Sequence, residues 1–298
     1  MDKNKTALLI GVGSFLTWGM LAIYWTQLKS VDPIEIVAHR AVWSVVFAGI
    51  LTVCLRQGLQ VIKAFKTSKL LLALICSSCL IALNWGIYIW AVINGRIVET
   101  SMGYYINPLF NVAASALIFR VALNKYQAVA IGFACIGVAI IIIGYGKVPY
   151  VAITLAASFC IYGVIRKVVP IDAIAGLFVE TVIIACPALI YILYKTVDGT
   201  GALVTADNFT LFLLVLGGIV TTLPLAGFAY AAKILNLSTV GIMQYISPTV
   251  SFLIGVFMYN EVFTNTHLMS FIFIWIGLVI YTADSIIKYE KEKKSVKN

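Results

Sequence analysis

GYYINPLFN, residues 103–111, decides the fold, because it places polar side chains and a proline inside a long apolar segment. The composition of the whole chain identifies the solvent around that segment. Of the 298 residues, 62% are hydrophobic and only 11% are charged, whereas soluble globular chains are about 25% charged. We therefore interpret the chain as an all-α integral membrane protein. A cluster of polar residues within one of its spans then requires an explanation.

Apolar segments long enough to cross the hydrocarbon core recur along the whole chain. One helix needs about 20 predominantly apolar residues to span roughly 30 Å of hydrocarbon. Such segments lie at 6–28, 34–55, 69–93, 100–119, 127–145, 149–165, 174–195, 209–232, 239–259 and 267–287. Most connections between them are short, and little of the chain is left for a soluble domain. The sequence therefore predicts ten transmembrane helices.

Basic residues predict the orientation of these spans, because lysine and arginine accumulate in cytoplasmic connections. Sixteen of the 21 basic residues fall on the side that holds both termini, four fall on the other side, and Arg40 lies within a span. We expect a multi-pass protein of the plasma (inner) membrane with both termini in the cytoplasm. The net charge of +9 then reflects topology and contact with anionic membrane lipid, not a nucleic-acid partner. Residues 56–69 alternate basic and apolar side chains and should lie along the inner membrane surface.

The two halves of the chain align with each other without gaps when YINP at 105–108 is placed on YISP at 245–248. This repeat alignment also places Phe133 on Phe273 and Gly137 on Gly277. Each half contains five spans, and because five is odd the second half enters the membrane from the opposite side. The pattern therefore predicts two inverted five-helix repeats, residues 1–146 and 147–298.

Two prolines, Pro108 and Pro248, lie near the middle of the fourth and ninth spans. A proline within a helix removes one backbone hydrogen bond and bends the helix, so we expect kinks that serve gating. Polar side chains accompany both prolines at helical spacing: Tyr104, Asn107 and Asn111 in the first half, and Gln244, Ser247 and Ser251 in the second. Such stripes either form hydrogen bonds between helices or line a shared central cavity. The symmetric duplication favours the cavity.

Charged residues also occur inside the spans, at positions that correspond in the repeat alignment. Arg40, with His39 beside it, lies in the second span and Glu180 in the seventh. A charge at that depth costs roughly 2.5–3.5 kcal/mol on insertion scales, so each needs a partner or water. The sequence leaves several roles open: an ion pair between the halves, binding of an anionic group by Arg40, or gating by a pair that breaks. Proton coupling through His39 or Glu180 would lack a relay of further ionisable residues.

Aromatic residues complete the predicted cavity wall. Trp18, Asn84, Trp85 and Tyr88 are central within their spans, whereas Tyr24 and Trp25 lie near a span end and are interpreted as anchors at the membrane interface. The candidate substrate-binding residues are Arg40, Glu180, Trp18, Asn84, Trp85, Tyr88, Tyr104, Asn107, Asn111, Gln244, Ser247 and Ser251. A wall of this composition suits an amphipathic or aromatic small molecule.

Catalytic and metal-binding motifs are not indicated. CSSC at 76–79 has the CxxC spacing, but it lies within a span and has neither a second pair nor a nearby histidine. GVGSFL at 11–16 lacks the third glycine and the strand context of a dinucleotide loop. We therefore expect no catalytic residue, no metal and no cofactor. The oligomeric state is not indicated.

Three strings carry a resemblance to a known family: AHRAVWS (38–44), NWGIYIWAVINGRIVETSMGYYINP (84–108) and MQYISPTVSFLIGVFMYNE (243–261). They resemble the RarD branch of the EamA group in the drug/metabolite transporter superfamily. The resemblance implies ten helices in two inverted repeats, with spans five and ten at the periphery of the substrate pathway. One departure concerns Glu261, which follows Pro248 at the spacing expected in the family, whereas the position at the same spacing after Pro108 is Val121.

The expected function is that of a secondary transporter, a permease that moves a small metabolite or drug-like molecule by alternating access. The direction of export comes from the resemblance, since no residue shows it. The alternatives are a membrane-embedded enzyme or lipid-handling protein without transport activity, which would need a catalytic cluster near one interface, and a passive channel. Paired kinked helices suit alternating closure better than an open pore.

Overall fold

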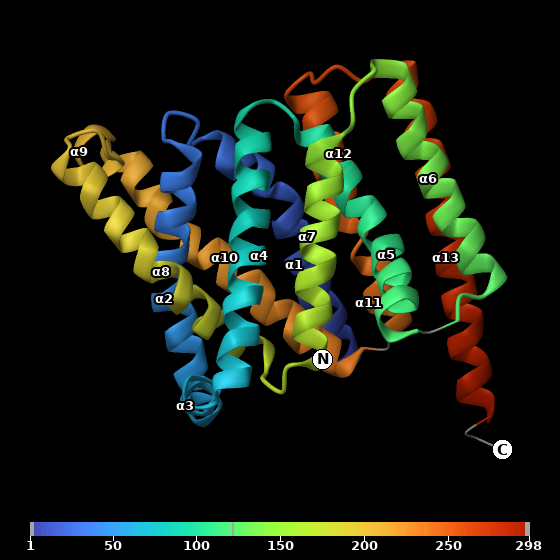
Figure 1. The fold of residues 1–298 in the computed structure, drawn as a ribbon, viewed down its shortest axis with the longest axis horizontal. Helices are drawn as coiled ribbons and strands as arrows, with labels where there is room; N and C mark the ends of the chain where they lie inside the picture. The colour runs from blue at the N-terminus through green and yellow to red at the C-terminus, as the bar shows by residue number, and fades with distance from the viewer. Residues whose placement is uncertain (1–2, 121, 236, 296–298) are drawn as a thin grey trace.

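The computed structural model describes residues 3–120, 122–235 and 237–295, and within these ranges it contains helices and connections but no β-strand (Figure 1). The helices are α1 (Lys3–Thr26), α2 (Pro33–Cys54), α3 (Gly58–Lys66), α4 (Ser68–Ile93), α5 (Ile97–Phe119), α6 (Lys125–Tyr145), α7 (Tyr150–Val168), α8 (Ala173–Val197), α9 (Ala202–Thr205), α10 (Asn208–Ile234), α11 (Leu237–Met243), α12 (Ile246–Leu253), the π-helical turn η1 (Ile254–Met258) and α13 (Asn265–Ser295). Val121 lies outside the described residues.

Nine segments of the described chain are long and apolar enough to cross a membrane. They correspond to nine of the segments predicted from hydropathy, and one of them, Thr239–Met258, consists of α11, α12 and η1 together. The remaining predicted segment, 100–119, coincides with α5, a helix of 23 residues. The polar side chains of α5 lower its hydropathy. The prediction of an all-helical, multi-pass membrane protein is confirmed.

Local sequence explains where several helices begin and end. The Asp32 carboxylate accepts hydrogen bonds from the first N–H groups of α2, at 2.9 Å from the nitrogen of Ile34, and Pro33 occupies the first turn, where a missing N–H costs nothing. Asn124 and Gln127 form a reciprocal capping box at the start of α6. At its other end, Gly146 adopts φ +63°, a conformation that favours glycine.

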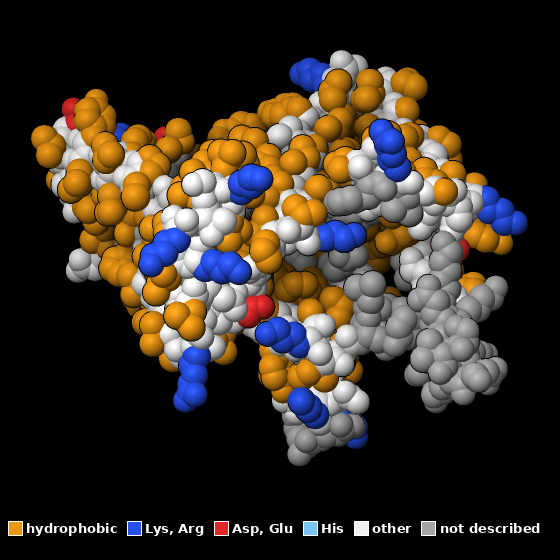
Figure 2. Space-filling view, turned by 60° about the horizontal axis from the view of Figure 1, so that its bottom comes forward, with side chains coloured by type: hydrophobic (Ala, Val, Ile, Leu, Met, Phe, Trp, Pro, Cys, Tyr) orange, Lys and Arg blue, Asp and Glu red, His pale blue; other side chains and the backbone are white. Residues whose placement is uncertain are grey.

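The segment predicted to lie along the inner membrane surface forms the short helix α3. Its last turn contains Lys63 and Lys66, and Ala64 is buried against neighbouring helices. In Figure 1, α3 lies at the same end of the molecule as the start of α1 and the end of α13, and Figure 2 shows basic side chains gathered over that end. The structure shows a helix in this segment, and its position along a membrane surface stays a prediction.

The packing of helices follows the repeat alignment. α6 packs on α13 and α2 packs on α8, so that helices at corresponding positions contact each other. Other contacts occur twice, once for each half. The contact of α5 with α7 corresponds to that of α12 with α1, and the contact of α4 with α7 corresponds to that of α10 with α1. The contact of α4 with α8 likewise corresponds to that of α10 with α2.

Between α6 and α13 the correspondence extends to single residues. Phe133 contacts Phe273, its own counterpart in the repeat alignment, with ring centroids 5.9 Å apart. A Cβ on Gly137 would lie 2.8 Å from the carbonyl oxygen of Ser270, and a Cβ on Gly277 would lie 2.7 Å from that of Ala130. Ser270 is itself the counterpart of Ala130. These two glycines allow the helices to approach closely at equivalent points.

The two prolines differ in their surroundings. Helix α5 continues through Pro108. In the second half the helix stops at Met243, and Gln244 and Tyr245 separate α11 from α12 just before Pro248. An interruption therefore occurs in the second half alone, where η1 adds a π-helical turn after α12. The kinks expected at the two prolines stay predictions. Such turns occur frequently at functional sites.

Candidate functional site

Arg40 on α2 lies at the meeting point of four helices. It is 6% exposed, and its Nε–H donates a hydrogen bond of 2.8 Å to the hydroxyl oxygen of Thr221 on α10. The guanidinium carbon lies 4.0 Å from the ring centroid of Trp85 on α4 and 5.1 Å from that of Trp25 on α1. Rings at these distances attract a cation through their electron-rich faces. The aromatic rings, rather than a carboxylate, therefore surround the buried charge.

Trp25 corrects one sequence interpretation. We expected an anchor at the membrane interface, but Trp25 is 1% exposed and lies against Arg40. Tyr24 beside it donates its hydroxyl hydrogen to the carbonyl oxygen of Leu213 on α10, so it too contacts protein. The indole N–H of Trp25 is buried and has no hydrogen-bond partner among the described residues.

Tyrosines from two further positions complete the surroundings of Arg40. Tyr88 on α4 and Tyr104 on α5 pack in the same apolar cluster as Trp25, and their ring centroids lie 5.8 Å apart in an edge-to-face arrangement. Trp85 and Tyr88 are both buried. The structure therefore brings together four of the candidate residues, Arg40, Trp85, Tyr88 and Tyr104, and adds Trp25 and Thr221.

Glu180 on α8 belongs to a different cluster. It is fully buried, accepts a hydrogen bond of 2.6 Å from Ser77 on α4 and one of 3.2 Å from Tyr162 on α7. An ion pair joins it to Arg166 on α7, with 3.7 Å between nitrogen and oxygen. Of the roles considered for the two buried charges, a direct ion pair between Arg40 and Glu180 is not formed among the described residues. The cation paired with Glu180 is Arg166. Arg166 lies near the end of a span, and we counted it in the sequence only among the basic residues that predict orientation.

The polar stripe of the first half contacts α7. Asn107 donates to the carbonyl oxygen of Ala156 at 3.1 Å, and Asn111 donates to the side-chain oxygen of Asn107 at 3.2 Å. Asn84 on α4 also contacts α7, where it donates to Leu155 and Ser158. Asn111 is exposed, whereas Asn84 and Asn107 are buried. Asn107 therefore forms the hydrogen bond between helices that we left open as the alternative for the stripes, and Asn84, a candidate for the cavity wall, forms bonds of the same kind.

The polar stripe of the second half contacts α1 in the corresponding way. Ser251 is 3% exposed and donates to the carbonyl oxygen of Gly19 at 2.9 Å. Gly19 allows this approach, since a Cβ there would lie 2.9 Å from the carbonyl oxygen of Ser247. Gln244 and Ser247 are half-buried. Trp18 is half-buried as well; it contacts Phe15 and Phe228 and packs against the apolar cluster that contains Trp25 and Tyr88.

Comparison with known proteins decides the family. Residues 5–143 match the EamA-like transporter family. The chain is 40% identical over 297 residues to the uncharacterized transporter YojE of Bacillus subtilis, and the match covers 98% of both chains. It is 34% identical to Protein RarD of Escherichia coli K12, covering 99% of this chain and 100% of the relative. This chain belongs to the RarD branch of the EamA family. The resemblance carried by the three strings is thereby confirmed, and the chain is a membrane transporter.

A solved structure shows the same fold at greater distance. That crystal structure is 17% identical in sequence, with a TM-score of 0.59 over 92% of this chain and 96% of the other. A more distant relative within the RarD branch, from Pseudomonas aeruginosa, is named chloramphenicol-sensitive protein RarD and is 27% identical over 298 residues.

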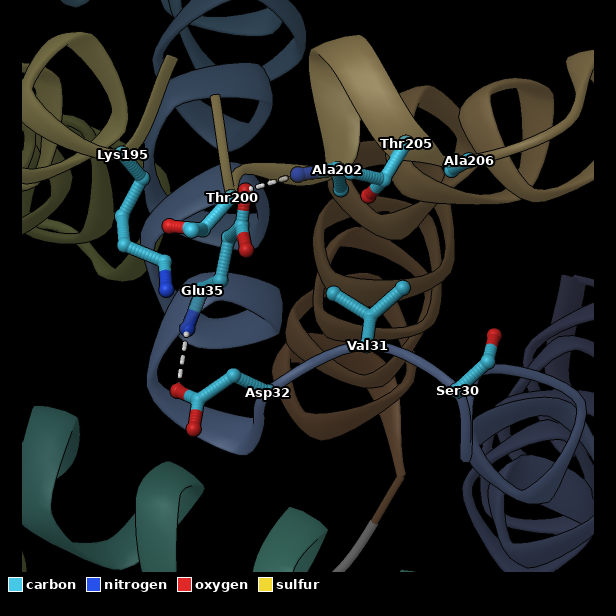
Figure 3. Close-up of a pocket in the computed structure, with 9 residues that line it drawn as sticks. All are labelled: Ser30, Val31, Asp32, Glu35, Lys195, Thr200, Ala202, Thr205 and Ala206. Carbon is cyan, nitrogen blue, oxygen red and sulfur yellow. Dashed lines mark hydrogen bonds between the residues drawn. The ribbon is translucent and has the colours of Figure 1, made fainter. Parts of the chain in front are cut away.

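This RarD-branch chain also contains a pocket of about 270 Å³ near the start of α2 (Figure 3). Its lining residues are Ser30, Val31, Asp32, Glu35, Lys195, Thr200, Ala202, Thr205 and Ala206. Glu35 is 2% exposed, and one of its carboxylate oxygens accepts a hydrogen bond of 2.6 Å from the backbone N–H of Ala202. The same oxygen lies 3.9 Å from Nε2 of His39, which has no hydrogen-bond partner among the described residues.

Glu261, the acidic residue expected from the family pattern, joins the two halves of the chain. Its two carboxylate oxygens accept hydrogen bonds from the backbone N–H groups of Ile97 at 2.6 Å and Val98 at 2.8 Å, at the start of α5. Burial raises the pKa of this carboxyl group. A carboxylate from one half therefore caps a helix of the other half.

The cysteines and the possible metal ligands of the described residues form neither a disulfide nor a metal-binding cluster. All six cysteines are free, and Cys76 and Cys79 of the CSSC string are exposed. No group of three histidine, cysteine, aspartate or glutamate side chains in the described ranges could hold a metal ion.

Proposed function

We propose that this chain is a secondary transporter that moves a small metabolite or drug-like molecule by alternating access between two inverted five-helix repeats, 1–146 and 147–298. In this proposal α5 crosses the membrane as the tenth span. Both termini lie in the cytoplasm, and transport proceeds outward across the plasma membrane. The corresponding helix pairs and the glycine contacts of α6 with α13 support the two-repeat organisation.

One observation carries the proposal: each of the two buried charges at corresponding positions is bound to the other half of the chain. Arg40 of the first half donates to Thr221 of the second. Glu180 of the second half accepts from Ser77 of the first. Movement of one half against the other must lengthen or exchange these hydrogen bonds. The two charges therefore lie where a change of accessibility would act, near the middle of inverted repeats.

The substrate pathway in this proposal is centred on Arg40 and the aromatic rings around it. Helices α6 and α13 pack mainly on each other and form the periphery. Pro108 and Pro248, with the interruption before α12, are the kink and gating positions. The other candidate residues, including Asn107 and Ser251, are expected to reach the pathway in a facing state that differs from the present one, since their present hydrogen bonds join helices.

Counterflow in proteoliposomes tests the proposal. Purified protein is first screened for compounds that raise its unfolding temperature, since a ligand that binds only the folded state stabilises it by mass action. The compounds include chloramphenicol, because one relative carries it in its name. Vesicles preloaded with a stabilising compound should then accumulate labelled external compound with saturable kinetics. Flux that rises linearly with concentration and shows no counterflow would indicate a channel, and binding without flux would contradict transport.

A second measurement tests the orientation and the number of crossings. Single cysteines are introduced at Lys66 and Lys195 in a cysteine-free variant, and intact cells are treated with a membrane-impermeant thiol reagent. The expected result is labelling at position 195 alone, because the connection after α8 faces outward and α3 faces the cytoplasm in the proposed topology. Labelling at position 66 alone would reverse the orientation.

A further inference from the structure

The site around Arg40 contains hydrogen-bond donors without acceptors. A guanidinium carries five N–H groups. The Nε–H of Arg40 donates to Thr221, but its two Nη groups have no hydrogen-bond partner among the described residues, and none of the ion pairs formed by those residues includes Arg40. The indole N–H of Trp25, whose ring faces this guanidinium, also lacks a partner. Two neighbouring side chains therefore present donors toward an acceptor that the described chain does not supply.

A charge buried in protein is costly unless hydrogen-bond acceptors or a counter-ion replace the hydration that it loses. Aromatic faces offset part of that cost by their attraction for a cation, and they hold the guanidinium between Trp85 and Trp25. They do not replace hydrogen-bond acceptors at its edge. The donor fork of arginine matches the two oxygens of a carboxylate, so an oxyanion is the ligand that fits these donors best.

We propose that the substrate is a small organic carboxylate that carries no free ammonium group, with its carboxylate bound by Arg40 and the Trp25 indole and its apolar part against the aromatic rings. This inference rests on the proposed transport function and names its substrate class. One cation is present at the site, so a monoanion balances it. The rings of Trp85, Tyr88 and Tyr104 supply the apolar wall.

The absence of an ammonium group follows from the acidic residues nearby. A zwitterion would bring a second positive charge close to the Arg40 guanidinium, and like charges disfavour each other unless an acidic residue offsets them. Glu180 is already bound by Arg166, Ser77 and Tyr162, and one oxygen of Glu35 is bound by the backbone of Ala202. No described acidic residue forms an ion pair with Arg40.

The binding test uses five probes of similar size or charge on purified full-length protein in detergent. Phenylacetate and hexanoate are carboxylates, phenylacetamide is neutral, phenylalanine is a zwitterion, and sodium chloride at equal ionic strength supplies an inorganic anion. The readout is the unfolding temperature as a function of probe concentration, which gives an apparent affinity. We expect at least one of the two carboxylates to stabilise the protein, and the other three probes to bind at least tenfold more weakly.

Variants assign the effect to the site. Arg40→Gln should weaken carboxylate binding on the order of 10- to 100-fold, as expected for hydrogen bonds to a charged group. Trp25→Phe keeps the ring and removes only the N–H, so it should weaken binding by less than Arg40→Gln. Arg96→Gln is the matched control, because Arg96 also lies over aromatic rings but is already paired with Glu99 at 2.7 Å. Its carboxylate binding should equal that of the unmodified protein.

Several results would overturn the inference. They are equal stabilisation by phenylacetamide or phenylalanine, stabilisation by chloride equal to that by the carboxylates, no stabilisation by either carboxylate, or full carboxylate binding in a folded Arg40→Gln protein. If Arg40→Gln does not fold, unchanged binding in Trp25→Phe takes its place as the contradicting result. Counterflow separates the two proposals: transport of a neutral compound would leave the proposed function standing, whereas carboxylate binding without flux would remove the function alone.

Discussion

Glu180 and Arg166 should show a strong energetic coupling in a double-mutant cycle. Their closest nitrogen and oxygen atoms are 3.7 Å apart, a separation at which two unit charges attract by roughly 4.5 kcal/mol at an effective dielectric constant of 20. Two observations reduce the net value. Glu180 loses all contact with solvent, and the Arg166 side chain keeps 13% of its surface exposed. We therefore expect a coupling free energy of about 1–2 kcal/mol, within the range for residues in contact.

The substitutions are chosen to remove charge and little else. Glu180→Gln keeps an oxygen that accepts from Ser77, and Arg166→Gln removes the cation. The Nη1 of Arg166 makes no hydrogen bond, but its Nη2 donates to the carbonyl oxygen of Asp172 at 3.2 Å. Arg166→Gln removes that bond too, and the cycle cancels its cost because the same bond is lost in the double variant. A second cycle combines Glu180→Gln with Arg40→Gln. These two residues share no hydrogen-bond partner, and the coupling between them should stay below about 0.5 kcal/mol.

The free energy of unfolding is measured in detergent micelles by denaturant titration, with tryptophan fluorescence as the signal and gel filtration to confirm that each variant is folded. The reasoning fails if Glu180 couples more strongly to Arg40 than to Arg166. It also fails if Arg166→Gln raises the free energy of unfolding, because the ion pair between Arg166 and Glu180 would then contribute no net stability.

Three further predictions use the same unfolding assay or cysteine labelling. Gly137→Ala and Gly277→Ala should each destabilise the protein by about 1–3 kcal/mol, because the added Cβ meets a carbonyl oxygen of the facing helix; a harmless substitution at either position would contradict the close packing. Glu261→Ala should cost about 2 kcal/mol through the two N–H groups left without an acceptor at the start of α5, whereas Glu261→Gln should cost less. Pro108→Ala and Pro248→Ala should bias the accessibility of cysteines near the two entrances in opposite directions, and labelling identical to that of the unmodified protein would leave both prolines with a structural role alone.

The helices could be predicted from the sequence because the bilayer demands about 20 apolar residues for each of them. Helix α5 shows the limit of that reasoning, since its tyrosines and asparagines lower its hydropathy while the helix itself persists. The interruption before Pro248 was less predictable. Both halves contain a proline at the corresponding position, but only the second half loses its helix at Gln244 and Tyr245. The difference depends on packing that the periodicity of a sequence does not contain.

The site could be predicted only in part. Arg40, Trp85, Tyr88 and Tyr104 were candidates because charge and aromatic character within a span are themselves signals. Trp25 was missed because a tryptophan near a span end usually marks the membrane interface. Arg166 was missed for a similar reason, since a basic residue at a span end reads as a topology signal. Its long side chain reaches Glu180, and Gly176 provides the room, because a Cβ there would overlap the guanidinium.

Arg40 and Glu180 occupy corresponding positions of the repeat, but among the described residues only Glu180 has a counter-ion. Glu180 has a cation and two hydroxyl donors within its own protein, so a substrate could use it only by displacing Arg166 and leaving that cation without its partner. Arg40 has one hydrogen bond and aromatic faces, so an oxyanion would not have to break an ion pair to bind it. A repeat that places opposite charges at one position thus separates their roles. Under the proposed function, the saturated charge holds the second half to the first, and the unsaturated charge binds the ligand.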